Sequence, residues 1–226
     1  MPPKSINLFA SAIAAAMTLH AACALAAEPS SMTDALEKVE HEWAHIMYQV
    51  TDKDAQEDQL KSLAAVSDKI VADYPGRAEP LIWDSVVTSS EARFANPFSA
   101  LGLAKRAREM LEQAGRIDYH ALDGAVPTSL GTLYFMVPGF PIGFGDDDKA
   151  RQYLEEAIAI SPKGIDSNFF YGDFLFRQKD YENAAVALKR VLDAPNVPDR
   201  PVWDAGRRAE ARKILKQIDD IVASNR

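Results

Sequence analysis

The sequence predicts an all-α protein, an α-solenoid of about four antiparallel helix pairs with a C-terminal capping helix. Apolar residues recur at spacings of three and four through most of the chain, as in amphipathic helices. No stretch alternates apolar and polar residues between hairpin turns, so no sheet is expected. Matching residues in the C-terminal half also recur 34 positions apart, which is the period of a helical repeat.

Residues 1–27 differ in composition from the rest of the chain. They carry one early lysine, Lys4, then a run of small and apolar residues, and they end in an Ala-rich stretch. This arrangement predicts a signal peptide cleaved near Ala26 or Ala27, followed by a single helical domain over 28–226. We therefore expect a periplasmic or secreted protein, with no transmembrane segment once the signal peptide is removed.

Cys23 offers an alternative to cleavage, because it follows two alanines and could carry a lipid anchor. The residue three positions before it is His20, where lipoprotein signals usually carry Leu. Cys23 is the only cysteine, so a chain cleaved after it has none. That chain can form no disulfide, thiol nucleophile or Cys-based metal site.

The charge of the chain narrows its possible partners. The formal net charge is −8, and loss of Lys4 with the signal peptide makes it one unit more negative. This balance argues against nucleic acid and against an anionic membrane surface as partners. No cofactor is expected.

Helical periodicity predicts the N-terminal elements, over 32–50, 56–73, 79–95 and 97–114. The last of them begins with Asn96 and Pro97. This pair is a typical helix start, because Asn caps free backbone amides and Pro pre-sets the first turn.

The repeat is clearest over 123–162 and 163–196. "DYENAAVALKRVLDAP" echoes "DDDKARQYLEEAIAISP", and Gly172 recurs as Gly206. Small residues at such positions let antiparallel helices approach closely. A final helix over 201–223 is rich in Arg and Glu, as the solvent-facing cap of a repeat array tends to be.

This period of paired helices resembles the tetratricopeptide repeat (TPR) over most of 32–223. "SLGTLYFMVPGFPIGFGDDDKARQYLEEAIAISPKGIDSNFFYGDFL", followed by "RPVWDAGRRAEARKIL", resembles exported bacterial TPR proteins and, more loosely, the T-component proteins of TRAP solute transporters. The second resemblance implies a periplasmic or lipid-anchored helical protein that oligomerises and docks a ligand-binding subunit. The implied function is non-enzymatic recognition of a partner protein or small ligand, with an accessory role in solute transport as its narrower form.

The first helices of a repeat array line its concave face, so residues at set offsets from the glycines are candidate contacts. They combine aromatic anchors with charges of both signs, as a peptide or small-ligand groove requires. The candidates are Phe135, Phe169, Asp173, Phe176, Arg177, Trp203 and Arg207. In one alternative Phe169 and Phe176 are core between repeats. In another, the end of the array is capped by salt bridges among Arg207, Arg208, Asp173 and Asp204.

A long loop over 137–146 interrupts the pattern between the two helices of one repeat. Loops that break a repeat often carry function, so Phe140 and Phe144 are also candidate contacts. They either fold back as a lid or stay exposed to hold a partner. The run Asp146–Asp148 that follows could bind calcium, but helix capping is the favoured interpretation.

"HEWAH" at 41–45 matches the H-E-x-x-H pattern of zinc peptidases, in which two histidines one turn apart hold the metal. The alternative function is therefore a small zinc metallopeptidase with His41 and His45 as ligands. The chain lacks the third-ligand pattern and the sheet expected of such enzymes. The favoured interpretation is a coincidental match, with the polar residues facing solvent and Trp43 and Ile46 packing inward.

Overall fold

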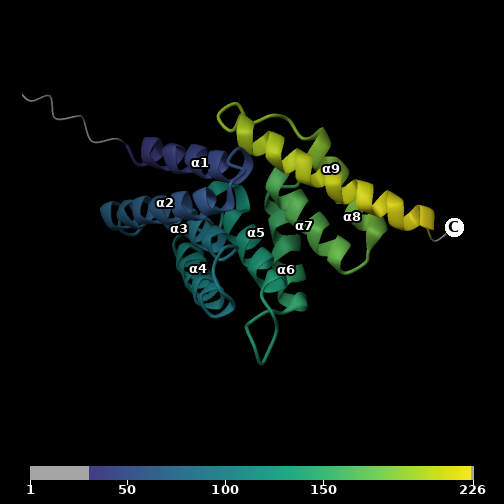
Figure 1. Cartoon of the computed structure of the whole chain (residues 1–226), viewed down its shortest axis with the longest axis horizontal. Coiled ribbons are helices and arrows are strands. Elements are labelled where there is room, and N and C mark those ends of the chain that lie inside the picture. Colours follow the sequence, from purple (N-terminus) through teal and green to yellow (C-terminus); the bar gives the residue numbers. More distant parts are fainter. Residues whose placement is uncertain (1–30, 225–226) are drawn as a thin grey trace, which may run out of the picture.

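The computed structural model describes residues 31–224, most of which are helical (Figure 1). The predicted signal peptide and Cys23 lie outside the described residues. Within 31–224, the β-type pairing is one isolated bridge between Gly139 and Gly145. The helices of this range are α1 (Met32–Tyr48), α2 (Lys53–Asp73), α3 (Ala78–Glu91), α4 (Pro97–Ile117), α5 (Ala121–Met136), α6 (Asp147–Ile160), α7 (Ile165–Arg177), α8 (Tyr181–Asp193) and α9 (Pro201–Ser224).

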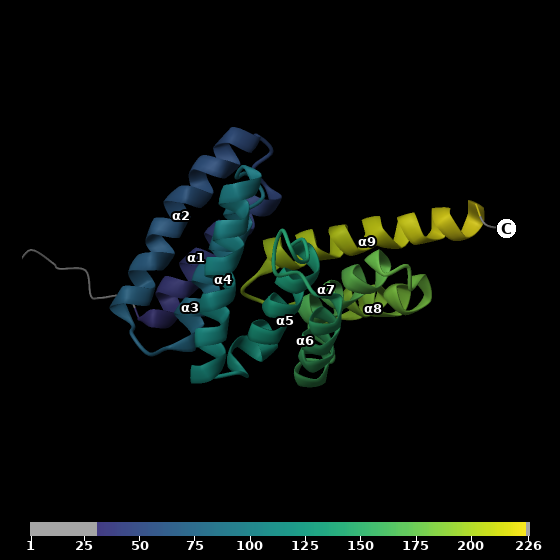
Figure 2. The ribbon, with the colours of Figure 1, turned by 90° about the horizontal axis from the view of Figure 1, so that it is seen from below.

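Consecutive helices pack as pairs, α1 with α2, α3 with α4, α5 with α6 and α7 with α8, and α9 follows as a ninth described helix (Figures 1 and 2). The predicted all-α solenoid of four pairs with a terminal helix is therefore confirmed. None of the helices in the described range is both long enough and apolar enough to cross a membrane.

Capping residues explain where the helices begin. Asn96 accepts hydrogen bonds from the amides of Phe98 and Ser99, so the predicted start at Asn96 is confirmed. The second helix begins before the predicted residue 56, because Asp52 accepts a bond from the Ala55 amide.

Two predicted helix ends were wrong. The third helix stops at Glu91 instead of 95, because the amides of Arg93 and Phe94 turn back to the carbonyls of Ser90 and Glu91. The fourth continues past 114 to Ile117.

Glycines explain the repeat period in terms of packing. A Cβ built on Gly172 in α7 would lie 2.7 Å from Cγ of Leu188 in α8. Gly131 in α5 has the same relation to Leu154 in α6, again at 2.7 Å. Each glycine lets the leucine of the second helix reach the backbone of the first, which fixes the close approach within a pair.

The odd-numbered helices form a closed ring instead of an open row. Each of α1, α3, α5 and α7 contacts the next odd-numbered helix, and α9 contacts both α7 and α1. Trp43, Trp83 and Trp203 meet where the ring closes, with ring centroids 4.9 Å apart for Trp43 and Trp203 and 5.4 Å apart for Trp83 and Trp203. Where the sequence predicts an open concave face, three tryptophans join α1, α3 and α9.

At Gly206, α1 takes the position that the second helix of a pair occupies elsewhere in the array. Gly206 is the repeat equivalent of Gly172, but no partner helix follows α9 in the described chain. The ring of Tyr48, at the end of α1, takes that place, and a Cβ on Gly206 would lie 2.3 Å from Tyr48 Cδ1. The Tyr48 hydroxyl donates to Glu210 at 3.2 Å. Burial, the largest cause, raises the pKa of this phenol.

We predict that Gly206→Ala destabilises the fold by about 1–3 kcal/mol, because the added methyl group collides with the base of the Tyr48 ring. Gly102→Ala in α4 is the matched control, since a Cβ there meets nothing within 4 Å. It should stabilise the protein by about 0.5–1 kcal/mol through helix propensity. Urea unfolding of both variants measures the difference, and equal effects would contradict the close contact between α1 and α9.

Candidate functional site

A groove of about 410 Å³ lies between α7 and α9 and brings together four residues predicted from the sequence. These are Phe169, Asp173, Phe176 and Arg177, which succeed one another along one face of α7. Helix α9 supplies the opposite wall through Glu210, Lys213, Ile214 and Gln217. Four of the nine predicted contact residues therefore line the α7–α9 groove.

The groove has an aromatic floor and a charged rim. Phe169 is buried and Phe176 is half-buried, while the side chain of Arg177 is 49% exposed. Arg177 pairs with Asp173 at 3.1 Å, and its guanidinium lies 5.4 Å from the ring centroid of Phe135. Phe135, a further candidate, thus contacts the rim from α5. Such a surface can bury apolar side chains of a ligand and orient its charged groups.

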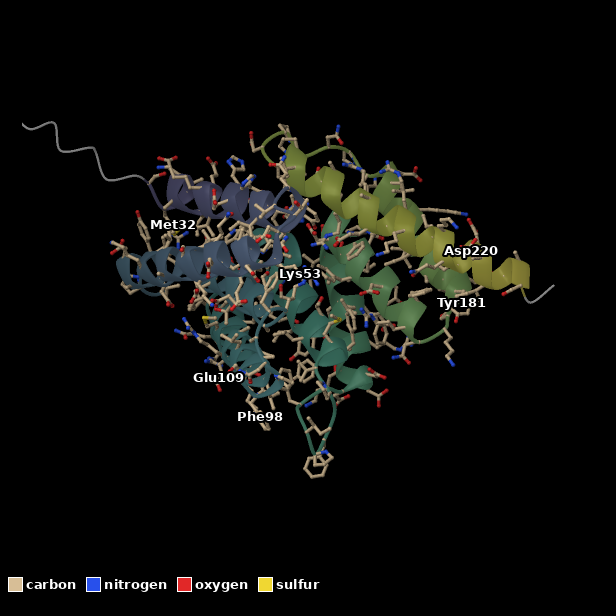
Figure 3. The ribbon with its side chains drawn as sticks, viewed as in Figure 1. Met32, Lys53, Phe98, Glu109, Tyr181 and Asp220 are labelled. Carbon is tan, nitrogen blue, oxygen red and sulfur yellow. The ribbon has the colours of Figure 1, made fainter. Side chains whose placement is uncertain are left out.

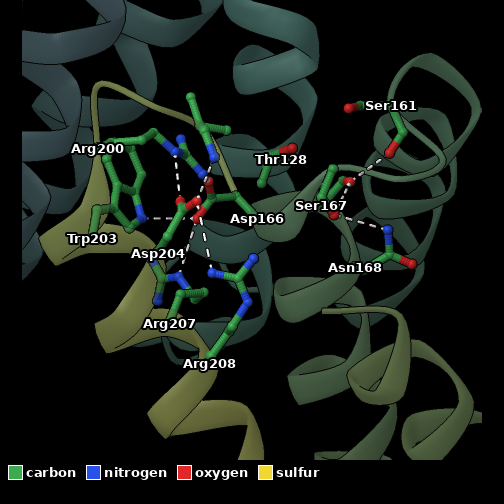
Figure 4. Close-up of polar contacts among 12 residues, drawn as sticks. Thr128, Ser161, Asp166, Ser167, Asn168, Arg200, Trp203, Asp204, Arg207 and Arg208 are labelled. Carbon is green, nitrogen blue, oxygen red and sulfur yellow. Dashed lines mark hydrogen bonds and ion pairs between the residues drawn. The ribbon is translucent and has the colours of Figure 1, made fainter. Parts of the chain in front are cut away.

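Asp166, at the start of α7, anchors the wall formed by α9 (Figure 4). Its carboxylate accepts hydrogen bonds from Arg200 at 2.7 Å, from Trp203 Nε1 at 3.1 Å and from Arg207 at 3.1 Å. Arg200 also pairs with Asp204 at 2.8 Å. Three donors from the start of α9 and the residue before it therefore converge on one side chain of α7.

Charge decides the protonation state of this cluster. Burial alone would raise the pKa of Asp166, but the guanidinium groups of Arg207 and Arg200 outweigh it and hold that pKa below its usual range. The guanidinium of Arg207 lies over the rings of Phe169 and Phe170, 4.5 and 4.6 Å from their centroids. It is 6% exposed, so this candidate lies behind the groove and holds it together.

The cap proposed for the arginines is only partly realised. The expected ion pair between Arg208 and Asp204 is present, at 3.8 Å. Arg207, in contrast, pairs with Asp166 and Glu210 instead of Asp173 or Asp204. The sequence analysis did not identify Asp166, because an acidic residue in the first turn of a helix is common. One signal was available, because Asp166 and Arg200 are separated by 34 residues, the repeat period.

The remaining aromatic candidates lie elsewhere. Trp203 belongs to the tryptophan cluster, and the guanidinium of Arg200 lies 4.2 Å from the centroid of its ring. The two phenylalanines of the loop differ in exposure. Phe144 folds back against Tyr134 and under Arg108, whereas Phe140 is 93% exposed.

The acidic run after the loop caps α6. Asp146 accepts hydrogen bonds from the amides of Asp148 and Lys149 at 3.1 and 3.0 Å. The Asp147 carboxylate accepts a bond from Gln178 at 2.8 Å. The favoured capping interpretation is therefore confirmed.

The H-E-x-x-H histidines make contacts within the fold. His41 Nε2 donates to the carbonyl of Asp199 at 2.5 Å, and His45 Nδ1 donates to Gln49 at 2.8 Å. Trp43 and Ile46 are buried, as the favoured interpretation requires. Across residues 31–224, no three His, Cys, Asp or Glu side chains gather as a metal site, so the zinc peptidase alternative has no support.

Over the described residues, the geometry is that of a helical-repeat protein in which α9 packs against α1. The sequence model of the tetratricopeptide repeat family matches residues 142–163. The crystal structure of TTC0263, a thermophilic TPR protein of Thermus thermophilus, is similar with a TM-score of 0.53 and 14% identity, over 81% of this chain and 100% of that chain. No curated protein sequence matches. The chain thus carries a tetratricopeptide repeat and has the fold of TPR proteins.

We predict that Asp166→Asn destabilises the protein by about 2–4 kcal/mol, because it leaves the buried Arg207 with a weakened set of partners. Asp173→Asn is the control. Its partner Arg177 is exposed, so the loss should stay below about 1 kcal/mol. Chemical denaturation at neutral pH compares the two, and similar losses would contradict the anchoring role.

The lowered pKa of Asp166 also predicts a dependence on pH. A carboxyl whose folded pKa is depressed contributes stability above its ordinary pKa of about 4, and that stability is lost as the pH falls through the folded value. The Asp166→Asn variant should therefore lose less stability than the parent between about pH 5 and 2. Parallel acid titrations followed by circular dichroism measure this; identical slopes would mean that Asp166 does not titrate as a paired group.

Proposed function

We propose that the protein is an exported, non-enzymatic scaffold that recognises a partner protein or a small ligand through the α7–α9 groove. The observation that carries the proposal is the convergence of Phe169, Asp173, Phe176 and Arg177 on one groove. Helical-repeat proteins commonly bind their partners through surfaces formed by successive repeats. The tetratricopeptide repeat and the TPR-like fold support the same class of function.

The rigidity of the groove walls favours recognition. Asp166 ties α9 to α7 through several charge-assisted bonds, so the groove need not be ordered when a ligand binds. The ligand should bury apolar or aromatic side chains on Phe169 and Phe176 and place acidic groups near Arg177 and Lys213.

The narrower form of the proposal is an accessory protein of a solute transport system, which acts in the periplasm and possesses the capacity to oligomerise. Its support is the composition of residues 1–27 and the resemblance of the 129–175 and 200–215 segments. A lipid anchor at Cys23 is the alternative mode of attachment.

Selection from a displayed library of random short peptides tests the groove. Bound peptides should be enriched in aromatic and acidic residues and should lose at least about tenfold in affinity with Arg177→Glu or Lys213→Glu. Lys189→Glu, an exposed residue of α8 outside the groove, should leave affinity unchanged. Recovery of no binding peptide, or equal losses in all three variants, would contradict the assignment.

The export expectation has a separate test. N-terminal sequencing of protein recovered from the periplasmic fraction of a bacterial host should begin near residue 27 or 28. A chain that starts at Cys23 and carries lipid would favour the anchored alternative. Recovery of uncleaved chain from the cytoplasm would refute export.

A further inference from the structure

One end of the molecule is built from two segments without charged residues, although 26% of the whole chain is charged. It is formed by the start of α4, over 96–104, and by the loop over 137–145. The loop sequence "VPGFPIGFG" contains no polar side chain at all. The two segments are in contact, because a Cβ built on Gly143 would lie 3.3 Å from Leu101 Cδ1.

This end exposes three large apolar side chains. Phe98 is 92% exposed, Phe140 93% and Ile142 70%. The loop projects beyond the ends of α5 and α6 (Figure 1), and Phe98 lies on the same edge of the molecule (Figure 3). The three residues form a convex apolar tip, which is unlike the recessed groove between α7 and α9.

The loop that presents the tip is a built structure. Its stem is closed by hydrogen bonds from the amide of Gly145 to Pro138 and from that of Asp146 to Tyr134, at 3.0 and 2.9 Å. A Cβ on Gly145 would lie 1.9 Å from the carbonyl oxygen of Val137, so only glycine fits there. Phe144 anchors the base between Tyr134 and Arg108. The exposure of Phe140 and Ile142 is therefore a fixed feature of the fold.

We infer that this tip, formed by Phe98, Phe140 and Ile142, inserts into the interfacial region of a zwitterionic lipid bilayer. A convex apolar projection needs no complementary cavity in a bilayer, because lipid chains adapt to its shape. Insertion desolvates no charged side chain within 137–145. The acidic residues Asp147 and Asp148, directly behind the loop, and the net charge of −8 favour a neutral surface over an anionic one.

Binding to phosphatidylcholine vesicles tests the inference, with the exported form of the protein and sedimentation as the readout. The parent should bind reversibly, and the Phe140→Ser/Ile142→Ser double variant should bind about tenfold or more weakly, since two apolar side chains leave the interface. Phe98→Ser should give a smaller loss. Replacement of part of the lipid by phosphatidylglycerol should not strengthen binding.

Val66→Ser and Val186→Ser are matched controls, because these valines are 51% and 47% exposed but lie on α2 and α8. They should bind vesicles as the parent does, and melting curves should show all variants folded. Absence of binding by the parent, or equal losses in the controls, would overturn the inference. So would self-association of the parent that the tip substitutions abolish without lipid, since the tip would then bind a second copy.

Discussion

The carboxylate of Asp166 is the constraint on which the arrangement of the last helix depends. Its bonds to Arg200, Trp203 and Arg207 fix the start of α9 against α7. From that position, Trp203 reaches the tryptophans of α1 and α3, and Glu210 reaches Tyr48. The same placement sets the width of the α7–α9 groove, whose far wall consists entirely of α9 side chains. Closure of the ring and formation of the candidate site thus have one electrostatic origin.

Closure has a consequence for how this repeat array presents its surface. The three tryptophans pack against one another where α1, α3 and α9 meet. Two surfaces of contrasting chemistry lie elsewhere: the amphipathic α7–α9 groove and the uncharged tip formed by Phe98, Phe140 and Ile142. Their chemistry suits different partners, because one combines an aromatic floor with charge and the other is wholly apolar.

Part of the candidate site could be predicted because it depends on local geometry. Phe169, Asp173, Phe176 and Arg177 are spaced by four, three and one along one helix, so helical periodicity alone places them on a common face. Helical periodicity could not predict whether Arg207 lies in the same groove as these four residues. The position of Arg207 depends on how far α9 rotates about its axis, and that rotation is set by Asp166, 41 residues earlier in the chain.

The sequence by itself determined the helices, the caps at Asn96 and Asp146, the pairing through Gly172 and the interrupting loop. All of these depend on residues within one helix or one repeat, where spacing dictates contact. Only the tertiary structure decided that α9 meets α1, that Phe144 is covered and that Phe140 is exposed. The contacts His41–Asp199 and Tyr48–Glu210 join residues 158 and 162 positions apart. Each helix pair is rotated slightly relative to the one before it, and the total rotation over four pairs decides whether such distant residues come into contact. A local sequence pattern does not contain this information.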